Sequence, residues 1–329
     1  MKPEPFPPTR IVIIGAGSIG CRHLRNVSMV WPTCQVSVVS ASGRMLSTEE
    51  LQGQQQMSLA EALALQPDFA IVASPAPWHL EHARQCLQAQ VPVLIEKPLS
   101  HSYSEASRFL AEMGSTELCS LAYCLRYLPS AQVVKQCLKE QRLGRLYSVQ
   151  SIVGQQLSQW RPAKDYRSSV SASAELGGGV LLELSHEFDY LLWLFGPLST
   201  RYCHVSVQGE LQLDVEESAD LVLSADGTLM CTLHLDFLQQ VAQRRCVISG
   251  QFGRIEWDLL KNSVLWVNQH GEAWLYNEPQ WDKNLMYVSL LKDFALALQR
   301  GMSAPVPLSD GVAVLELVEQ AKTLAMVGG

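Results

Sequence analysis

Ile11-Val12-Ile13-Ile14-Gly15-Ala16-Gly17-Ser18-Ile19-Gly20 is the stretch of this sequence that decides the fold. Four β-branched residues in a row predict a buried strand, and the glycines after them predict a tight turn into a helix. In this G-x-G-x-x-G pattern, Gly15 allows the turn, Gly17 lets the main chain approach a diphosphate, and Gly20 lets the helix pack closely on the strand. The first N–H groups of such a helix and its dipole favour phosphate charge. We therefore expect a dinucleotide to bind over Gly15, Gly17, Ser18, Ile19 and Gly20.

The same alternation of strand and helix continues through the first third of the chain. Apolar runs predict strands at 36–39, 69–73, 91–95 and 118–123, with helices at 58–66 and 78–90 between them. Fully apolar strands separated by amphipathic helices indicate a parallel sheet that is covered on both faces. We expect an N-terminal dinucleotide-binding Rossmann domain over residues 1–123.

The pattern changes after Pro129. Strands are predicted at 146–152, 202–207, 218–223, 229–237, 245–249, 254–257 and 263–267, and helices at 131–140, 181–195, 286–300 and 309–326. Asp226-Gly227 and Phe252-Gly253 are turn signals of antiparallel hairpins. The fold class is therefore α/β plus α+β, with a second domain over 124–329 that carries helices on one face of an open, mostly antiparallel sheet. The last helix is expected to pack back on the first domain.

Composition excludes several classes of partner. The 329 residues are 47% hydrophobic and 17% charged, with a net charge of −7, so no basic stripe is available for a nucleic acid. No apolar run reaches the roughly 18 residues that span a bilayer, and the proline-rich N-terminus lacks the apolar core of a signal peptide. The nine cysteines are scattered without a CxxC pair, which indicates reduced thiols and no metal knuckle. We expect a cytoplasmic protein with neither nucleic-acid nor membrane partners.

The tip of the second strand bears on which dinucleotide binds. In NAD-binding units an acidic residue about 20 positions after the glycines holds the ribose 2′-hydroxyl. Residues 40–44 read Ser-Ala-Ser-Gly-Arg, without a carboxylate. Ser40, Ser42 and Arg44 suit a 2′-phosphate better, so NADP is favoured over NAD. The alternative is that Arg44 is only a solvated loop charge.

A strand at 91–95 runs into Glu96-Lys97-Pro98. In open parallel sheets, ligands bind in the crevice beyond the carboxyl ends of the strands, which puts Glu96 and Lys97 at the mouth of that crevice. A lysine that is partly desolvated there has a lowered pKa and can carry a proton. The alternative reading is a surface Glu-Lys pair.

Glu96-Lys97-Pro98 is preceded in the chain by Ser74-Pro75-Ala76-Pro77-Trp78-His79. With these two motifs, the sequence resembles the Gfo/Idh/MocA oxidoreductases over nearly its whole length. These enzymes use NAD(P) and act mostly on sugars, cyclitols and related hydroxy compounds. The segment 123–129 resembles the family's entry into the second domain, although Cys124 stands where many members have asparagine. The resemblance implies that Lys97 lies beside nicotinamide and substrate and that Lys97-Pro98 is a cis peptide. It places Ser74, Pro75, His79 and Glu96 on the cofactor side.

Residues 177–189, Gly-Gly-Gly-Val-Leu-Leu-Glu-Leu-Ser-His-Glu-Phe-Asp, are expected to carry the other half of the chemistry. Glu183 and His186 are i and i+3, so they share a helix face, with Asp189 one turn further. Histidine suits removal of a hydroxyl proton near neutral pH. The open alternatives are a surface ion-pair cluster or a metal site at Glu183 and His186.

This stretch resembles the family's glycine-rich helix with aspartate, histidine and aspartate, with two departures. Glu183 replaces the first aspartate, and one residue is missing before His186. The resemblance therefore favours His186 as the proton-handling group, with Glu183 orienting it or contacting a substrate hydroxyl.

The loop at 160–167 is dense in stacking and hydrogen-bonding groups, which suit a hydroxyl-rich or anionic substrate. It resembles a subgroup found among polysaccharide and acidic-sugar biosynthesis proteins. The expected substrate-binding residues are Arg126, Trp160, Arg161, Tyr166, Arg167 and Asp189. An oligomer contact or a solvated loop is the alternative.

The leading hypothesis is an oxidoreductase that moves hydride between nicotinamide and a secondary alcohol or ketone of a sugar, nucleotide sugar or cyclitol. A glycosidase-type enzyme with transient oxidation by NAD, or a non-catalytic NAD(P)-binding sensor, are the alternatives. We also expect a homodimer or homotetramer that pairs through the open sheet face. The apolar residues on which this expectation rests are Leu221, Val222, Leu223, Leu233, Leu235 and Phe237.

Overall fold

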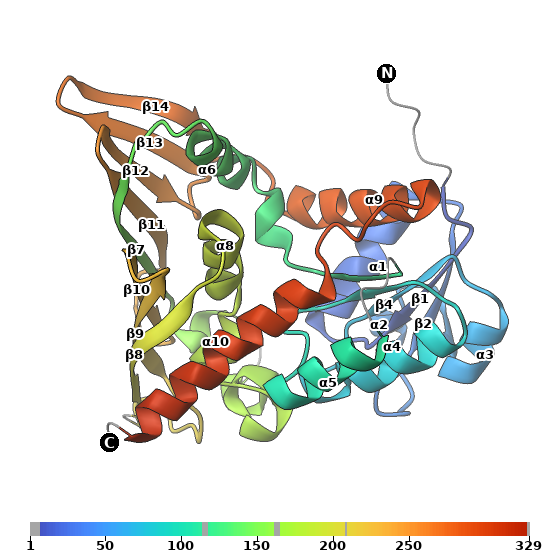
Figure 1. Ribbon diagram of the computed structural model, residues 1–329. Coiled ribbons are helices and arrows are strands. Elements are labelled where there is room, and N and C mark those ends of the chain that lie inside the picture. Colours follow the sequence, from blue (N-terminus) through green and yellow to red (C-terminus); the bar gives the residue numbers. More distant parts are fainter. Residues whose placement is uncertain (1–6, 114–117, 161–164, 208, 328–329) are drawn as a thin grey trace. The chain divides into compact units, whose positions relative to one another are not determined.

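The computed structural model describes residues 7–113, 118–160, 165–207 and 209–327, which form two compact units (Figure 1). The first contains the chain up to Cys124 together with Asn284–Val312, and the second contains Leu125–Lys283 and the chain from Ala313 onward. The segment 284–312 therefore belongs to the first unit, whereas the sequence places it in the second domain. Helix α10 (Leu308–Val327) begins in the first unit and continues in the second.

A six-stranded parallel sheet in the order β3-β2-β1-β4-β5-β6 forms the centre of the first unit. This confirms the expected Rossmann sheet, although the short edge strand β3 has no clear apolar signal in the sequence. The strands are β1 Arg10–Ile14, β2 Gln35–Val39, β3 Gln55–Met57, β4 Phe69–Val72, β5 Val93–Ile95 and β6 Cys119–Leu121.

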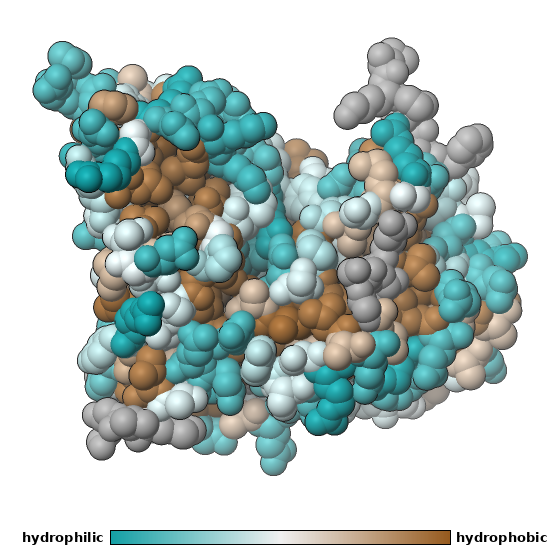
Figure 2. Space-filling view, viewed as in Figure 1, coloured by the Kyte–Doolittle hydropathy of each residue, from teal (hydrophilic) through white to brown (hydrophobic). Residues whose placement is uncertain are grey.

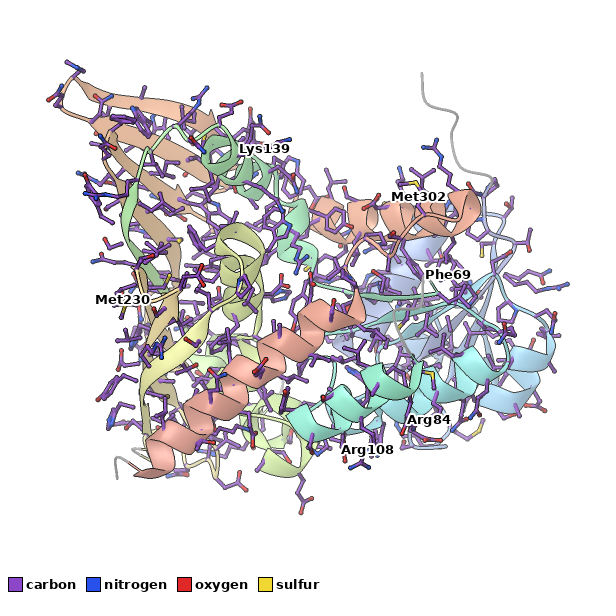
Figure 3. The ribbon with its side chains drawn as sticks, viewed as in Figure 1. Phe69, Arg84, Arg108, Lys139, Met230 and Met302 are labelled. Carbon is purple, nitrogen blue, oxygen red and sulfur yellow. The ribbon has the colours of Figure 1, made fainter. Side chains whose placement is uncertain are left out.

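Helices cover both faces of this sheet (Figure 1). Helices α1 (Ser18–Val30) and α9 (Asn284–Arg300) pack together on one face, and α3 (Leu59–Ala64), α4 (His79–Gln88) and α5 (Tyr103–Met113) lie on the other. Phe69, labelled in Figure 3, makes edge-to-face contacts with Trp31 and Phe294 at centroid distances of 6.1 and 5.4 Å. These rings join α9 to the core of the first unit. The shorter elements are α2 Thr48–Leu51 and the 3-10 turn η1 Ala76–Trp78.

The second unit is built on an eight-stranded sheet in the order β14-β13-β12-β11-β7-β10-β9-β8. Only β7 and β10 pair in parallel among its described strands, so the sheet is mostly antiparallel, as expected. Strand β14 is mostly exposed, and the sequence pattern does not reveal it. The strands are β7 Leu146–Gly154, β8 Ser199–Ser206, β9 Ser218–Ala225, β10 Leu229–Asp236, β11 Gln243–Gly250, β12 Gly253–Asp258, β13 Ser263–Asn268 and β14 Gly271–Asn277.

Helices lie on one face of this sheet (Figure 1). They are α6 Pro129–Lys139, α7 Val180–Glu183, α8 His186–Phe195 and most of α10, with 3-10 turns η2 Cys124–Tyr127, η3 Leu157–Gln159, η4 Tyr166–Ser168, η5 Val170–Ala172 and η6 Ala174–Leu176. The single helix expected at 181–195 is two helices. The N–H groups of Ser185 and Glu187 bond to carbonyls three residues back, at 3.3 and 3.1 Å, so the chain tightens between α7 and α8.

Most of the apolar residues that were expected on the open face of the second sheet lie on its other face. Strand alternation turns Leu221, Leu223, Leu233, Leu235 and Phe237 toward the helices, where each is at most 2% exposed. Of the six residues expected on the open face, only Val222 lies there. Met230 is 41% exposed and points away from the helices (Figure 3). On the side in view in Figure 2, apolar residues gather over the strands of this unit with hydrophilic residues around them.

Among the described residues, no helix combines the length and the apolar character needed to cross a membrane.

Candidate functional site

The three motif glycines of the first unit have separate roles. Gly15 has φ +105°, and a Cβ there would come within 2.4 Å of the Ala73 carbonyl oxygen. A Cβ on Gly20 would lie 1.9 Å from the Gly15 carbonyl oxygen. No atom lies within 4 Å of a Cβ built on Gly17. Packing therefore requires glycine at Gly15 and Gly20, and Gly17 leaves open space where a ligand approaches.

The beginning of α1 is suited to bind an anion. Gly17 is its N-cap and makes no side-chain capping bond, and the first turn has no acidic residue. Gly17 and Ser18 are exposed. Because the first N–H groups of a helix have no acceptor within it, they are available to a diphosphate. The residues at this position fit a dinucleotide.

Parallel register brings the expected active-site residues to one edge of the first sheet. Ile14 pairs with Val72, and Val72 pairs with Ile95. The residues that follow these strands, Gly15 on one side and Glu96 on the other, therefore lie at the same carboxyl edge.

Glu96 is a buried anchor in front of Lys97. It is 5% exposed, and its Oε2 accepts the Lys97 N–H at 3.1 Å. Its Oε1 lies 2.6 Å from Nε2 of His23, which is fully buried on α1. The Lys97-Pro98 peptide is cis, as the resemblance implies. The carboxylate thus fixes the main chain at Lys97 and ties it to the helix that follows the glycine loop.

Sequence reasoning assigned no role to His23. A signal was nevertheless present, because His23 stands with Gly20, Leu24 and Val27 on the buried face of α1. A histidine on the buried face of a helix requires a buried partner. Here that partner is Glu96, 73 residues away in the chain.

His79 holds the main chain together and does not project from the site. Its Nδ1 lies 2.8 Å from the Pro98 carbonyl oxygen, and its Nε2 lies 2.6 Å from that of Ser74. Burial lowers its pKa. Both ring nitrogens face main-chain carbonyl oxygens, of which a neutral imidazole donates to one, and the expected contact of His79 with the cofactor stays a prediction. The hydroxyl of Ser74 is turned to Nδ1 of His82 at 3.0 Å, while Pro75 caps η1.

Arg44, expected to meet a 2′-phosphate, is engaged within the protein. Its Nη1 donates to Oε2 of Glu50 at 3.0 Å, and its Nη2 donates to Oε1 of the same carboxylate. Ser40 and Ser42 belong to a turn in which the Gly43 N–H bonds to the Ser40 carbonyl at 3.2 Å. The arginine on which the expected NADP preference partly rested is therefore paired with a carboxylate of the same segment.

In the second unit, Glu183 ends α7 and His186 begins α8, so the helix face they were expected to share is interrupted between them. Both side chains are half-buried. Glu216, which sequence reasoning missed, holds the beginning of α7: its Oε1 accepts the Leu181 N–H at 3.2 Å. Burial raises the pKa of Glu216. No group of three or more His, Cys, Asp or Glu residues is arranged to hold a metal in the part of the chain that the structure describes.

Two residues expected to bind substrate bind each other instead. Arg126 donates from Nε to Oδ2 of Asp189 at 3.0 Å and from Nη2 to Oδ1 at 2.5 Å. Asp189 is fully buried and Arg126 is 7% exposed. Two residues earlier, buried Glu187 forms a similar pair with Arg244, at 2.6 and 2.9 Å. These carboxylates anchor α8 within the second unit, so the interpretation of Arg126 and Asp189 as substrate contacts is not supported.

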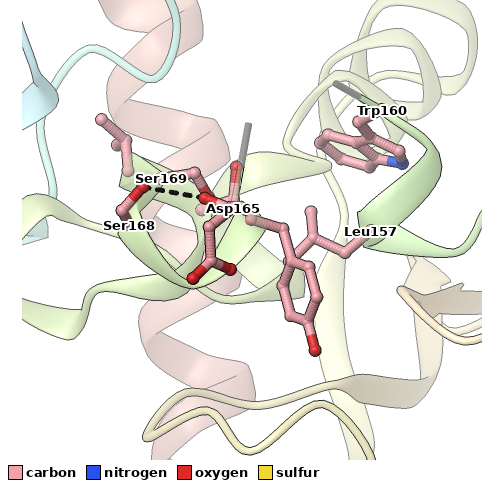
Figure 4. Close-up of a pocket in the computed structure, with 8 residues that line it drawn as sticks. Leu157, Trp160, Asp165, Ser168 and Ser169 are labelled. Carbon is pink, nitrogen blue, oxygen red and sulfur yellow. Dashed lines mark hydrogen bonds between the residues drawn. The ribbon is translucent and has the colours of Figure 1, made fainter. Parts of the chain in front are cut away.

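The loop expected to bind substrate forms a cavity of about 260 Å³ within the second unit (Figure 4). Trp160, stacked edge-on against Phe237 at 5.4 Å, lines it together with Tyr166. Arg167 is exposed, packs over the Tyr166 ring at 5.1 Å, and does not line the cavity. Arg161 lies outside the described residues. The remaining lining residues are Leu157, Asp165, Ser168, Ser169, Val170 and Ser171.

Comparison with known families agrees with this architecture. Residues 9–122 match the model "Oxidoreductase family, NAD-binding Rossmann fold", and residues 131–256 match the "GFO/IDH/MocA C-terminal domain". The chain is 24% identical over 328 residues to the rhizopine catabolism protein MocA of Rhizobium meliloti, covering 96% of this chain and 94% of the relative. It is 27% identical over 286 residues to inositol 2-dehydrogenase 2 of Paenarthrobacter aurescens, covering 80% and 79%.

Solved structures share the fold over nearly the full length. Levoglucosan dehydrogenase, in a complex with NADH and levoglucosan, superimposes with a TM-score of 0.84 at 18% identity and covers 97% of each chain. The myo-inositol 2-dehydrogenase of Lactobacillus plantarum gives a TM-score of 0.80 at 18% identity and covers 98% of each chain.

Proposed function

The chain belongs to the Gfo/Idh/MocA family of oxidoreductases, and from this premise we propose that it transfers hydride between a nicotinamide dinucleotide and a secondary alcohol or ketone of a sugar-like or cyclitol-like substrate. The observation that carries the proposal is the carboxyl edge of the first sheet. There the open beginning of α1 and the Glu96-Lys97 turn follow strands held in one register. Relatives named as inositol dehydrogenases support this substrate class.

The residues of this chain have distinct tasks in the proposed reaction. The α1 N–H groups hold the diphosphate, and the buried Glu96 fixes the main chain from which the Lys97 side chain extends. When bound, the nicotinamide ring accepts or donates the hydride. Lys97 and His186 handle the proton of the substrate hydroxyl, and Glu183 orients His186 or contacts a hydroxyl.

Absorbance at 340 nm tests the reaction class. Sugars, nucleotide sugars and cyclitols are screened with added NAD and NADP, in both reaction directions. We expect net formation or loss of reduced nucleotide with at least one substrate. Substrate conversion without any change at 340 nm contradicts the proposal and favours transient oxidation within a hydrolytic cycle.

Substitutions then test the residues. We expect Lys97→Met and His186→Asn to lower kcat by more than about 100-fold, because each removes a proton carrier, with the Kd for NADH changed less than about threefold. Lys139→Met and His204→Asn, at exposed positions of the second unit, are the matched controls. Unchanged kcat in His186→Asn removes His186 from the mechanism.

We further propose that two copies of the chain pair through the face of the second sheet opposite its helices. Tyr202, Met230 and Trp274 are 56%, 41% and 57% exposed on strands of this sheet, and large exposed apolar side chains favour association. Light scattering at micromolar concentration is expected to give a dimer or tetramer. Met230→Lys should dissociate it, whereas Met302→Lys, at a 51% exposed position of the first unit, should not. A monomeric wild-type chain contradicts this proposal.

A further inference from the structure

Arg44 and Glu50 form an ion pair with two hydrogen bonds in the segment that follows β2. Besides its two bonds from the guanidinium, the Glu50 carboxylate accepts the Ser47 N–H at 2.9 Å, and the Glu50 N–H returns a bond to the Ser47 hydroxyl at 3.2 Å. The Glu50 side chain is 24% exposed and that of Arg44 is 55% exposed. Hydrogen bonds from Arg44 and Ser47 lower the pKa of Glu50 to about 2. The carboxylate is therefore ionised throughout the neutral range.

The position of this pair is tied to the glycine loop. The Gly15 N–H donates to the Val39 carbonyl at 2.8 Å, so the chain leaving β2 starts beside that loop. Gln52 donates to the Cys21 carbonyl of α1 at 3.2 Å, and Gln56 donates to the Arg44 carbonyl at 2.8 Å. These bonds hold the segment from Arg44 to Glu50 at the place where dinucleotide-binding units distinguish a ribose 2′-hydroxyl from a 2′-phosphate.

We propose that Glu50 is the residue that makes this chain select NAD(H) over NADP(H). The inference rests on the proposed function, because it requires a nicotinamide dinucleotide to bind over the glycine loop. Two effects act together. Glu50 already satisfies the guanidinium of Arg44, and its own negative charge repels a 2′-phosphate at the same strand tip. The expected acidic residue is thus supplied by a short helix that follows the strand, outside the usual spacing.

The size of the effect is limited by solvent. An exposed ion pair is weak, and the repulsion between partly exposed like charges is screened. We therefore expect a change of about tenfold in NADPH affinity when the Glu50 charge is removed, and not several orders of magnitude.

Fluorescence titration of purified protein with NADH and with NADPH tests the proposal without a known substrate. The wild type should bind NADH more tightly. Glu50→Gln, which keeps a side chain suited to the helix cap, should lower the Kd for NADPH about tenfold and leave that for NADH within about twofold. Glu49→Gln removes an equal charge from the adjacent exposed position and should change neither Kd. In the double variant Arg44→Gln, Glu50→Gln, the gain for NADPH should be smaller, because the freed guanidinium is gone and only the loss of the Glu50 repulsion remains.

An unchanged ratio of the two Kd values in Glu50→Gln overturns the inference, as does tighter binding of NADPH by the wild type or a gain that persists undiminished in the double variant. If the wild type binds neither nucleotide, the proposed function itself fails and the inference fails with it.

Discussion

The carboxyl edge of the first sheet and the paired helices α7 and α8 of the second unit carry the two halves of the expected chemistry, and they differ in how their polar side chains are placed. At the sheet edge, Gly15 and Glu96 follow strands whose register the main chain fixes. In α8, Glu187 and Asp189 are oriented by arginines 57 and 63 residues away.

This difference explains where the structure places the residues expected at the site. A residue that follows a parallel strand reaches the binding edge whatever its side chain does. A carboxylate on an interior helix is directed to the nearest cation, because burying it unpaired is costly. The same helix pattern therefore suits a substrate contact and an internal ion pair equally well.

The largest effect is expected from a substitution that disturbs the main chain at the edge of the first sheet. Gly20→Ala brings a Cβ to 1.9 Å from the Gly15 carbonyl oxygen, so helix α1 must separate from β1. We expect the free energy of unfolding in urea to fall by more than about 5 kcal/mol, or the chain not to fold. Gly17→Ala is the matched control: its Cβ meets no atom within 4 Å, and stability should change little. If Gly20→Ala has wild-type stability, close packing of α1 against the main chain at Gly15 is not required for the structure of this edge.

The next effect concerns the side-chain pair of α8. Asp189→Asn leaves the buried Arg126 guanidinium without its countercharge, and we expect a loss of roughly 3–5 kcal/mol in the free energy of unfolding. Replacing both partners, as Arg126→Met with Asp189→Leu, should recover a large part of this loss. If Asp189→Asn keeps wild-type stability and raises only the KM for substrate, the interpretation as a substrate contact is restored.

A smaller effect is expected at His23 and Glu96, where a pair of buried side chains holds the main chain at the edge of the first sheet. His23→Ala removes the partner of a buried carboxylate 2.6 Å away and should cost about 2 kcal/mol in urea unfolding. It should also lower kcat, because Glu96 no longer fixes the main chain at Lys97. His23→Gln keeps a donor and should recover part of both losses. A variant that loses stability and retains full kcat would limit His23 to a structural role.

The smallest effect comes from the outer face of the second sheet, where solvent weakens charge pairs. Hydrogen bonds from His234 to Asp236 and Asp220 raise the pKa of His234 to about 9. Because this value exceeds the ordinary value of 6.5, the stabilisation is complete below pH 6.5 and is lost as the pH rises through 9. We expect wild type to lose less than about 1 kcal/mol between pH 6 and pH 10 through this group. The pH dependence should be smaller in His234→Gln, and an identical dependence would contradict the assignment.

The sequence predicted the first unit better than the second. Apolar runs and glycine turns located five of its six strands, because buried parallel strands are apolar on both faces. The second sheet was predicted with the correct character, but its inward residues were assigned to the open face. Alternation shows that two faces differ, and it does not show which one the helices cover.

Local structure was therefore determined by the sequence alone at the glycine loop and the Lys97 turn, whereas the break between α7 and α8 follows from no short-range pattern. Only the tertiary structure decided the partners of the buried charged residues. His23 meets Glu96 and Asp189 meets Arg126 because folding brings a buried charge against the group that compensates its desolvation. Such pairing depends on the whole chain, and no local pattern specifies it.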